Sequence, residues 1–118
     1  VELEMPLIVK KDGRRESFDR GKLLAGFKKA CEKRPVSVEA MDKAVESIER
    51  KLQDLGEKEV SSSVVGEAVM AALRDLDDVA FLRFASVYLS PRDVGELLDA
   101  MKARARAKIE NAGSEPRS

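Results

Sequence analysis

The first part of the chain combines a short apolar run with a turn signal. Leu7 to Lys11 is largely apolar and β-branched, Asp12-Gly13 is a strong two-residue turn signal, and Arg14 to Phe18 resumes the run. Glycine adopts the positive φ angle that such a turn needs without a Cβ clash. The pattern therefore predicts a β-hairpin over residues 7–18.

Helical spacing of apolar residues follows the hairpin. Asp19 can cap a first helix that we expect to reach about Lys33, where Arg34-Pro35 ends it. A second helix begins after Ser37 and stops at Gly56. Its apolar residues alternate between spacings of four and three, which places them on one face. They are Met41, Val45, Ile48, Leu52 and Leu55.

Three further helices are predicted towards the end of the chain. After a short link over residues 57–60, the serines at positions 61, 62 and 63 offer N-cap oxygens for the third. Asp77 or Asp78 can cap the fourth. Ser90-Pro91 starts the fifth, because serine can cap and proline fits the first helical position. We expect this helix to end near Asn111 and residues 112–118 to be disordered.

Composition indicates a globular protein of one domain, and the predicted hairpin followed by helices places it in the α+β class, mainly α-helical. Hydrophobic residues make up 43% and charged residues 37% of 118 residues, a balance that excludes general disorder. Lys plus Arg and Asp plus Glu both count 22, so any site for a polyanion must be local. No apolar run approaches the roughly 18 residues of a membrane span, so we predict a cytoplasmic protein without a membrane partner.

Residue types restrict the chemistry of the chain. It has no histidine and a single cysteine, Cys31, which excludes the familiar nucleophile–base pairs and nitrogen or sulfur metal sites within these residues. Cys31 falls on the apolar face of the first helix and is predicted to be a core residue. No carboxylates stand out as an acid–base pair. We therefore predict no catalytic residues, no metal site and no enzymatic activity.

Cations cluster on the predicted hairpin, over the segment from Val9 to Glu16. Lys10, Lys11, Arg14 and Arg15 lie on or beside one tight turn, and Lys22 follows at the start of a helix. Ammonium groups, guanidinium groups and backbone N–H groups can converge there on a triphosphate. The alternative is an ordinary solvated turn. The chain contains neither a P-loop nor a G-x-G-x-x-G motif.

The ordered motifs resemble a known family. Residues 7–23, reading LIVKKDGRRESFDRGKL, are similar to the start of an ATP-cone, the regulatory nucleotide-binding domain of many ribonucleotide reductases. Four further stretches resemble the NrdR family of bacterial repressors of ribonucleotide reductase genes, and the similarity covers roughly residues 5–101. They read ACEKRPVS (30–37), SSVVGEAVM (62–70), VAFLRFASVYLS (79–90) and RDVGELL (92–98).

The resemblance implies a bundle of four to five helices with a short N-terminal β-hairpin lid. It implies that ATP or dATP, with magnesium assisting, binds beneath the lid and that occupancy sets the oligomeric state and hence DNA binding. Lys10 and Lys11 would meet phosphates, Glu16 and Phe18 would line the base or sugar region, and Lys22 with Leu23 would close the pocket. The full predicted nucleotide-binding set is Val9, Lys10, Lys11, Arg14, Glu16, Phe18, Lys22, Leu23, Ser62 and Arg83.

Two departures from the family pattern affect this expectation. Lys11 stands where many cones have arginine, which keeps the charge and loses the bidentate fork. The family's four-cysteine zinc ribbon is absent from these residues, and residues 1–5 resemble the junction that follows it. We therefore expect a segment upstream of Val1 to carry the zinc and the DNA contacts. The nucleotide-binding domain would span residues 6–101, and residues 102–118 would form a helix end and tail.

Two other functions stay open from the sequence alone. The chain could be the cone of a reductase separated from its catalytic body, or a helical protein-interaction module whose basic hairpin is accidental. The later helices carry more apolar surface than one small core requires, which predicts a homo-oligomer. The predicted interface residues are Phe81, Tyr88, Val94 and Leu97.

Overall fold

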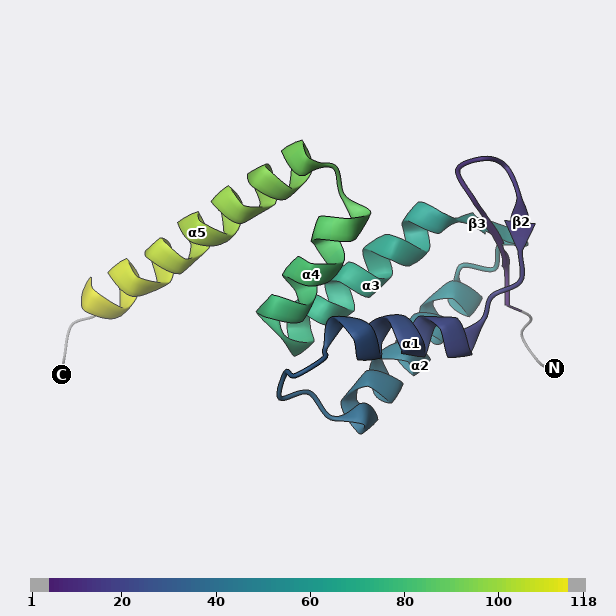
Figure 1. Ribbon diagram of the computed structural model, residues 1–118, viewed down its shortest axis with the longest axis horizontal. Helices are drawn as coiled ribbons and strands as arrows, with labels where there is room; N and C mark the ends of the chain where they lie inside the picture. Colours follow the sequence, from purple (N-terminus) through teal and green to yellow (C-terminus); the bar gives the residue numbers. More distant parts are fainter. Residues whose placement is uncertain (1–4, 115–118) are drawn as a thin grey trace. The chain divides into compact units, whose positions relative to one another are not determined.

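The computed structural model describes residues 5–114, with side chains described as far as Asn111. Five helices and a three-stranded sheet occupy this part of the chain (Figure 1), which confirms a mainly α-helical α+β fold. In chain order the elements are β1 (Leu7–Val9), β2 (Arg15–Glu16), α1 (Arg20–Ala30), α2 (Val38–Asp54), β3 (Glu59–Ser61), α3 (Ser62–Leu76), α4 (Asp78–Tyr88) and α5 (Pro91–Ser114).

Two compact units divide the chain, Val1–Phe84 and Ala85–Ser118, and the boundary between them falls within α4. The first unit contains the sheet, α1, α2, α3 and the first part of α4. The second contains the end of α4 and α5. None of the helices in residues 5–114 combines the length and the apolar content that a bilayer-spanning helix requires.

The predicted hairpin is present. Strands β1 and β2 pair antiparallel, with Ile8 opposite Glu16 and Val9 opposite Arg15. Gly13 has a φ of 88°, and its N–H donates to the Lys10 carbonyl at 2.9 Å. The turn thus uses glycine for the backbone conformation that other residues rarely adopt.

A third strand was missed by the sequence analysis, which treated residues 57–60 as a link. Strand β3 pairs parallel with β1, and its register places Val60 opposite Ile8 and Ser61 opposite Val9. The strand has three residues, of which only Val60 is buried. So short a segment has too few residues to show an alternating pattern, and long-range pairing with β1 defines it.

Helix starts follow the predicted caps in four of the five helices. Side chains of Asp19, Ser37, Asp77 and Ser90 accept hydrogen bonds from backbone N–H groups in the first turns of α1, α2, α4 and α5, at 2.9–3.2 Å. The exception is α3, where the predicted serine cap is wrong. Ser61 makes no side-chain capping bond, and its hydroxyl instead hydrogen-bonds the Ser63 hydroxyl at 2.8 Å.

Two predicted helix ends are also wrong. Helix α1 stops at Ala30 rather than near Lys33, because the chain turns there and Lys33 has a φ of 61°, outside the helical region. Helix α5 continues to Ser114, so residues 112–114 are helical and not disordered. The predicted tail residues 115–118, like residues 1–4 of the predicted junction, lie outside the described part of the chain.

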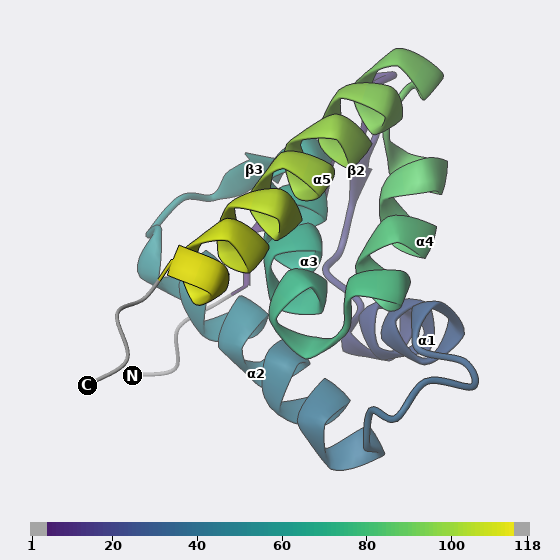
Figure 2. The ribbon, with the colours of Figure 1, turned by 90° about the vertical axis from the view of Figure 1, so that its left-hand side faces the viewer.

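The core of the first unit is built from one face of each helix. In α2 the predicted apolar stripe is buried, except for Leu55, which follows the last helical residue and is 51% exposed. Helix α2 packs against α1 and against α3, and Figure 2 shows the three helices after a turn of 90° from the view of Figure 1. The largest side chains that are fully buried are Phe27, Ile48, Leu52, Leu73 and Val45.

Cys31 is buried at the end of α1, as predicted for a core residue. Loss of water around the thiol is the main cause that raises its pKa, and the nearby Asp77 carboxylate adds to the effect. A raised pKa keeps the thiol protonated at neutral pH and therefore a poor nucleophile.

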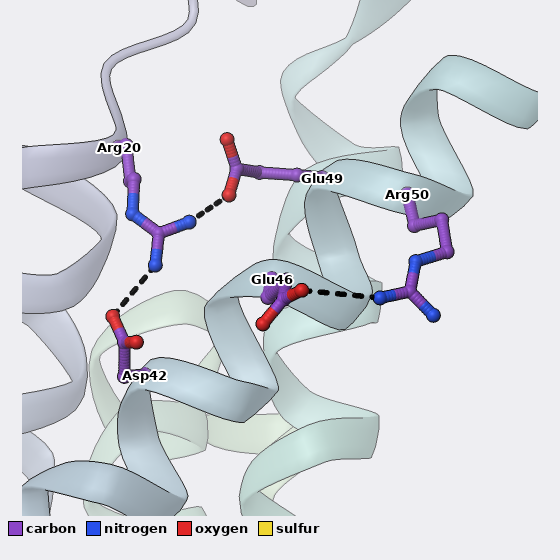
Figure 3. Close-up of polar contacts among 5 residues, drawn as sticks. All are labelled: Arg20, Asp42, Glu46, Glu49 and Arg50. Atoms are coloured by element: carbon purple, nitrogen blue, oxygen red, sulfur yellow. Dashed lines mark hydrogen bonds and ion pairs between the residues drawn. The ribbon is translucent and has the colours of Figure 1, made fainter.

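Charged side chains join α1 to α2 at the surface of this core. Arg20 contacts Glu49, and its other terminal nitrogen donates to Asp42 Oδ1 at 2.6 Å (Figure 3). Within α2, Arg50 donates to Glu46 at 3.2 Å, one turn apart. Asp42 is the main cause that holds the pKa of Arg20 above its ordinary value. Because Arg20 begins α1, these contacts fix the direction in which that helix leaves the hairpin.

Candidate nucleotide-binding site

The end of the hairpin holds the first predicted site residues. Val9 is the last residue of β1, and Lys10 follows it, with its N–H donating to the Arg14 carbonyl at 2.8 Å. Lys10 Nζ lies 3.6 Å from Glu16 Oε2 on β2. Both side chains are about two-fifths exposed, so the ion pair is accessible to a ligand and weak enough to exchange.

Two arginines of the basic cluster are already engaged. Arg14 Nε lies 2.7 Å from Asp12 Oδ2 within the turn, and Arg15 Nε lies 2.6 Å from Glu59 Oε1 on β3. The hydrogen bond to Glu59 raises the pKa of Arg15. Arg15 therefore joins β2 to β3 across β1, and within the hairpin Lys11 has no ion-pair partner among the described residues.

Lys11 and Lys22 are exposed and have no ion-pair partner among residues 5–114. Lys11 is in the hairpin turn, and Lys22 is in the first turn of α1, where its N–H is bound by Asp19. Their ammonium groups are the cations of this region that a phosphate group could engage without first breaking an ion pair.

Strand β3 brings the start of α3 to the hairpin. The parallel ladder ends with Ser61 opposite Val9, so α3 begins directly after the last residue paired with β1. Ser62 is the first residue of α3 and is half-buried. Ser61 provides no side-chain cap for α3, and the positive end of that helix dipole lies next to the end of β1.

Phe18 and Leu23 lie on either side of the α1 cap. Phe18 is in the segment that joins β2 to α1, Leu23 is in the first turn of α1, and both are half-buried. They supply partly exposed apolar surface where the hairpin passes into α1. Val9, Lys10, Lys11 and Glu16 thus lie on the hairpin, Phe18, Lys22 and Leu23 lie at the entry to α1, and Ser62 begins α3; that these residues form one nucleotide site stays a prediction.

Arg83 lies at a different place from the other predicted residues. Its Nη1 donates to the Ala30 carbonyl at 3.1 Å and to the Glu32 carbonyl at 2.6 Å, at the C-terminal end of α1. Lys22 is in the opposite, N-terminal turn of that helix. In this structure Arg83 satisfies carbonyl groups that the helix end leaves without an internal partner, and its role in nucleotide binding stays a prediction.

The predicted interface residues also differ in placement. Phe81 is only 4% exposed in the first unit, and the Arg74 guanidinium lies 5.5 Å from its ring centroid. Phe81 therefore offers little surface to a second copy. Tyr88 ends α4, and Val94 and Leu97 are on α5, all three half-buried.

A structural ion pair near the start of α4 was not anticipated. Arg34 Nε and Nη2 donate to the two carboxylate oxygens of Asp77 at 2.9 and 3.0 Å. The Arg34 hydrogen bonds, followed by the Ala80 N–H, hold the pKa of Asp77 below its ordinary value. The sequence predicted only that Asp77 could cap α4, because no sequence pattern indicates a contact between positions 34 and 77.

A pocket of about 370 Å³ lies elsewhere, between α2 and α3. It contains none of the predicted nucleotide-binding residues, and alanine methyl groups and other apolar atoms form much of its wall. A triphosphate needs converging cations and N–H donors, so the hairpin region fits that ligand better. The pocket is lined by Ala40, Lys43, Ala44, Ser47, Ile48, Lys51, Ala71, Ala72, Asp75 and Leu76.

Comparison with known proteins identifies the family to which the chain belongs. The family model of the ATP cone domain matches residues 6–94, most of the chain. A transcriptional repressor NrdR from Myxococcus xanthus is 57% identical over all 118 residues, which cover 70% of its length. The chain belongs to the NrdR family of transcriptional repressors.

Other NrdR proteins extend the similarity. The Anaeromyxobacter sp. (strain K) protein is 53% identical over 90% of this chain and 68% of its own length, and that of Geobacter sulfurreducens is 54% identical over 86% and 68%. The NrdR match continues beyond residue 94, where the cone model ends, which favours a repressor over a reductase cone.

Within the described residues, no group of three or more His, Cys, Asp or Glu side chains could hold a metal ion.

Proposed function

We propose that this chain binds adenine nucleotides at the hairpin, as part of a repressor of ribonucleotide reductase genes. The nucleotide that is bound, ATP or dATP, determines the oligomeric state of that repressor. Membership of the NrdR family and the ATP cone domain support an adenine-nucleotide-binding regulator rather than an enzyme. Cytoplasmic location and DNA as the regulated partner accord with such a repressor. The zinc and the sequence-specific DNA contacts are assigned to a ribbon outside these residues.

The observation that carries this proposal is the start of α3, which has no side-chain cap from Ser61 and follows the strand paired with β1 of the basic hairpin. The other four helices begin with a side-chain cap, whereas α3 begins without one, directly after the Ser61–Val9 pair. A helix N-terminus with free N–H groups attracts phosphate oxygens, and adjacent ammonium groups strengthen the attraction. Lys10, Lys11 and Lys22 are assigned to the phosphates, with magnesium shared among the phosphate oxygens.

The remaining site residues are assigned to the nucleoside. Phe18 and Leu23 offer apolar surface to the base, and Glu16 can accept hydrogen bonds from a sugar hydroxyl when Lys10 turns to the phosphates. ATP and dATP differ by one such hydroxyl. A single hydrogen-bond partner contributes about 1–3 kcal/mol when its loss leaves a buried group unpaired, which is enough for the site to distinguish the two.

Titration calorimetry with ATP and with dATP, each with magnesium, tests the site directly. We expect both to bind and to be recovered as intact triphosphates, because the described residues include no positioned base and no Walker motif to activate water. GTP at the same concentration serves as the control for base selection. If neither ATP nor dATP gives a heat of binding, and neither competes with the other for the chain, the proposed function is refuted.

Nucleotide identity is expected to change the mass of the assembly. A ligand shifts an equilibrium between two assemblies by its difference in affinity for them, so even a modest preference for ATP or dATP acts on the whole oligomer. Light scattering in ATP, in dATP and without nucleotide should give different masses at one protein concentration. The same mass in all three conditions would show that the bound nucleotide does not change the oligomeric state, and would refute that part of the proposal.

A further inference from the structure

The second half of α5 carries an unbalanced block of positive charge. Between Ala100 and Ile109 the sequence has four cations and no acidic residue. All four are exposed, and none has an ion-pair partner among the described residues, in contrast to Arg92, which pairs with Glu96 one turn along α5. The four cations, here called the α5 basic block, are Lys102, Arg104, Arg106 and Lys108.

Alternation with alanine distributes these cations over two sides of the helix. At 100° per residue, Lys102 and Arg106 share one flank, and Arg104 and Lys108 share the flank roughly opposite. Each pair is one turn apart. The face between the flanks carries the small residues Ala103 and Ala107, so nothing bulky separates the two rows of charge.

Two rows of cations on opposite flanks match the walls of a DNA groove. The major groove of B-form DNA is about 12 Å wide, and a helix with side chains is about 10–12 Å across. A helix lying in that groove has a phosphate backbone on each side, and the alanine face can approach the base edges closely. We propose that the α5 basic block contacts the phosphates of duplex DNA and adds sequence-independent affinity to the repressor.

The same geometry disfavours two other polyanions. The major groove of A-form RNA is too deep and narrow for a helix to enter. A helix that lies on a membrane needs large apolar residues on the same stretch as its cations. In α5 the apolar residues Val94, Leu97 and Leu98 precede the basic block and share their turns with Asp93, Glu96 and Asp99. Within the block itself, between Met101 and Ile109, the residues that separate the cations are all alanine.

Fluorescence anisotropy of a labelled 30-base-pair DNA duplex, titrated with the 118-residue chain, tests the inference. The protein concentrations should span about 10 µM, in the range of non-specific dissociation constants. We expect weak binding that is alike for a reductase promoter and a scrambled duplex, and that falls about a hundredfold between 50 and 200 mM salt. The variant K102Q/R104Q/R106Q/K108Q should lose at least tenfold in affinity at 50 mM salt. Its slope of log affinity against log salt should be smaller by about 3 to 4.

A matched control changes the same number of charges on other helices. The variant K28Q/K29Q/K43Q/K51Q neutralises four exposed lysines of α1 and α2 and should keep the original salt slope. Equal losses in both variants, no DNA binding by the unmodified chain at 50 mM salt, or tighter binding to an RNA duplex or to anionic vesicles would each overturn the inference. The inference rests on the repressor function proposed above. ATP titration of the unmodified chain and of both variants separates the two proposals. If the unmodified chain does not bind ATP, the nucleotide proposal alone is refuted.

Discussion

Replacing Lys10 or Lys22 by alanine is expected to weaken ATP and dATP binding about tenfold to a hundredfold each. A hydrogen bond to a charged group contributes about 1.5–3 kcal/mol, which corresponds to that range of affinity. In the proposed site the two lysines reach the phosphates from different elements, the hairpin and the first turn of α1. Losing either one therefore leaves the phosphates without a donor on one side.

Replacing Lys10 by alanine has a second effect, which replacing Lys22 does not have. In the unmodified chain Lys10 faces Glu16 across the hairpin at 3.6 Å. Removing the ammonium group leaves the Glu16 carboxylate without this partner, close to where the phosphates are assigned, and like charges repel. We therefore expect Lys10→Ala to have the larger effect of the two on affinity.

Calorimetric titration of both variants checks this expectation, with Lys43→Ala as the control. Lys43 is an exposed lysine of α2 and is not a predicted site residue, so its replacement should leave nucleotide affinity unchanged. Circular dichroism of each variant verifies that the helices are intact. Unchanged binding of both nucleotides by Lys10→Ala and by Lys22→Ala would place the site elsewhere, with the pocket between α2 and α3 as the next region to examine.

Replacing Phe27 by alanine is expected to lower the free energy of unfolding by about 3–5 kcal/mol. Phe27 is fully buried, and it is the one aromatic side chain that α1 contributes to the core of the first unit. Its truncation removes apolar contacts and leaves a cavity that a close-packed core fills only partly. Since domains of this size are stable by about 5–15 kcal/mol, the loss is a large part of the total.

Denaturant titration measures the change, and Leu55→Ala provides the contrast. Leu55 is 51% exposed, so we expect its replacement to change stability by less than about 0.5 kcal/mol. Phe27→Leu should fall between the two because it leaves a smaller cavity. A Phe27→Ala variant as stable as the unmodified chain would show that α1 is not anchored through this side chain.

Local patterns in the sequence were sufficient for most of the secondary structure. The Asp12-Gly13 turn, the caps at Asp19, Ser37 and Ser90, and the apolar stripe of α2 are interactions between residues near one another in the chain. Their physical causes, which are backbone conformation, capping and helical periodicity, act within a few residues. Such features can be predicted without knowledge of the tertiary contacts.

The errors in the helix ends have a different origin. The sequence predicts that α1 reaches about Lys33 and that α5 ends near Asn111, yet α1 stops at Ala30 and α5 continues to Ser114. At the end of α1, Arg83 from a distant part of the chain binds the Ala30 and Glu32 carbonyls. Helix ends depend on partners for unsatisfied carbonyl groups, and a partner 51 or 53 positions away leaves no local signal.

The sequence by itself determined the mainly helical fold, the hairpin with its cationic turn and the family resemblance that comparison with known proteins confirmed. Only the tertiary structure decided what lies beside that turn. Pairing of β3 with β1 brings Ser61 opposite Val9, so that α3 begins beside the end of β1, and it places Glu59 where it forms an ion pair with Arg15. The physical reason is that parallel pairing and ion pairs depend on distance in space, and periodicity along the chain records only which face of an element is apolar.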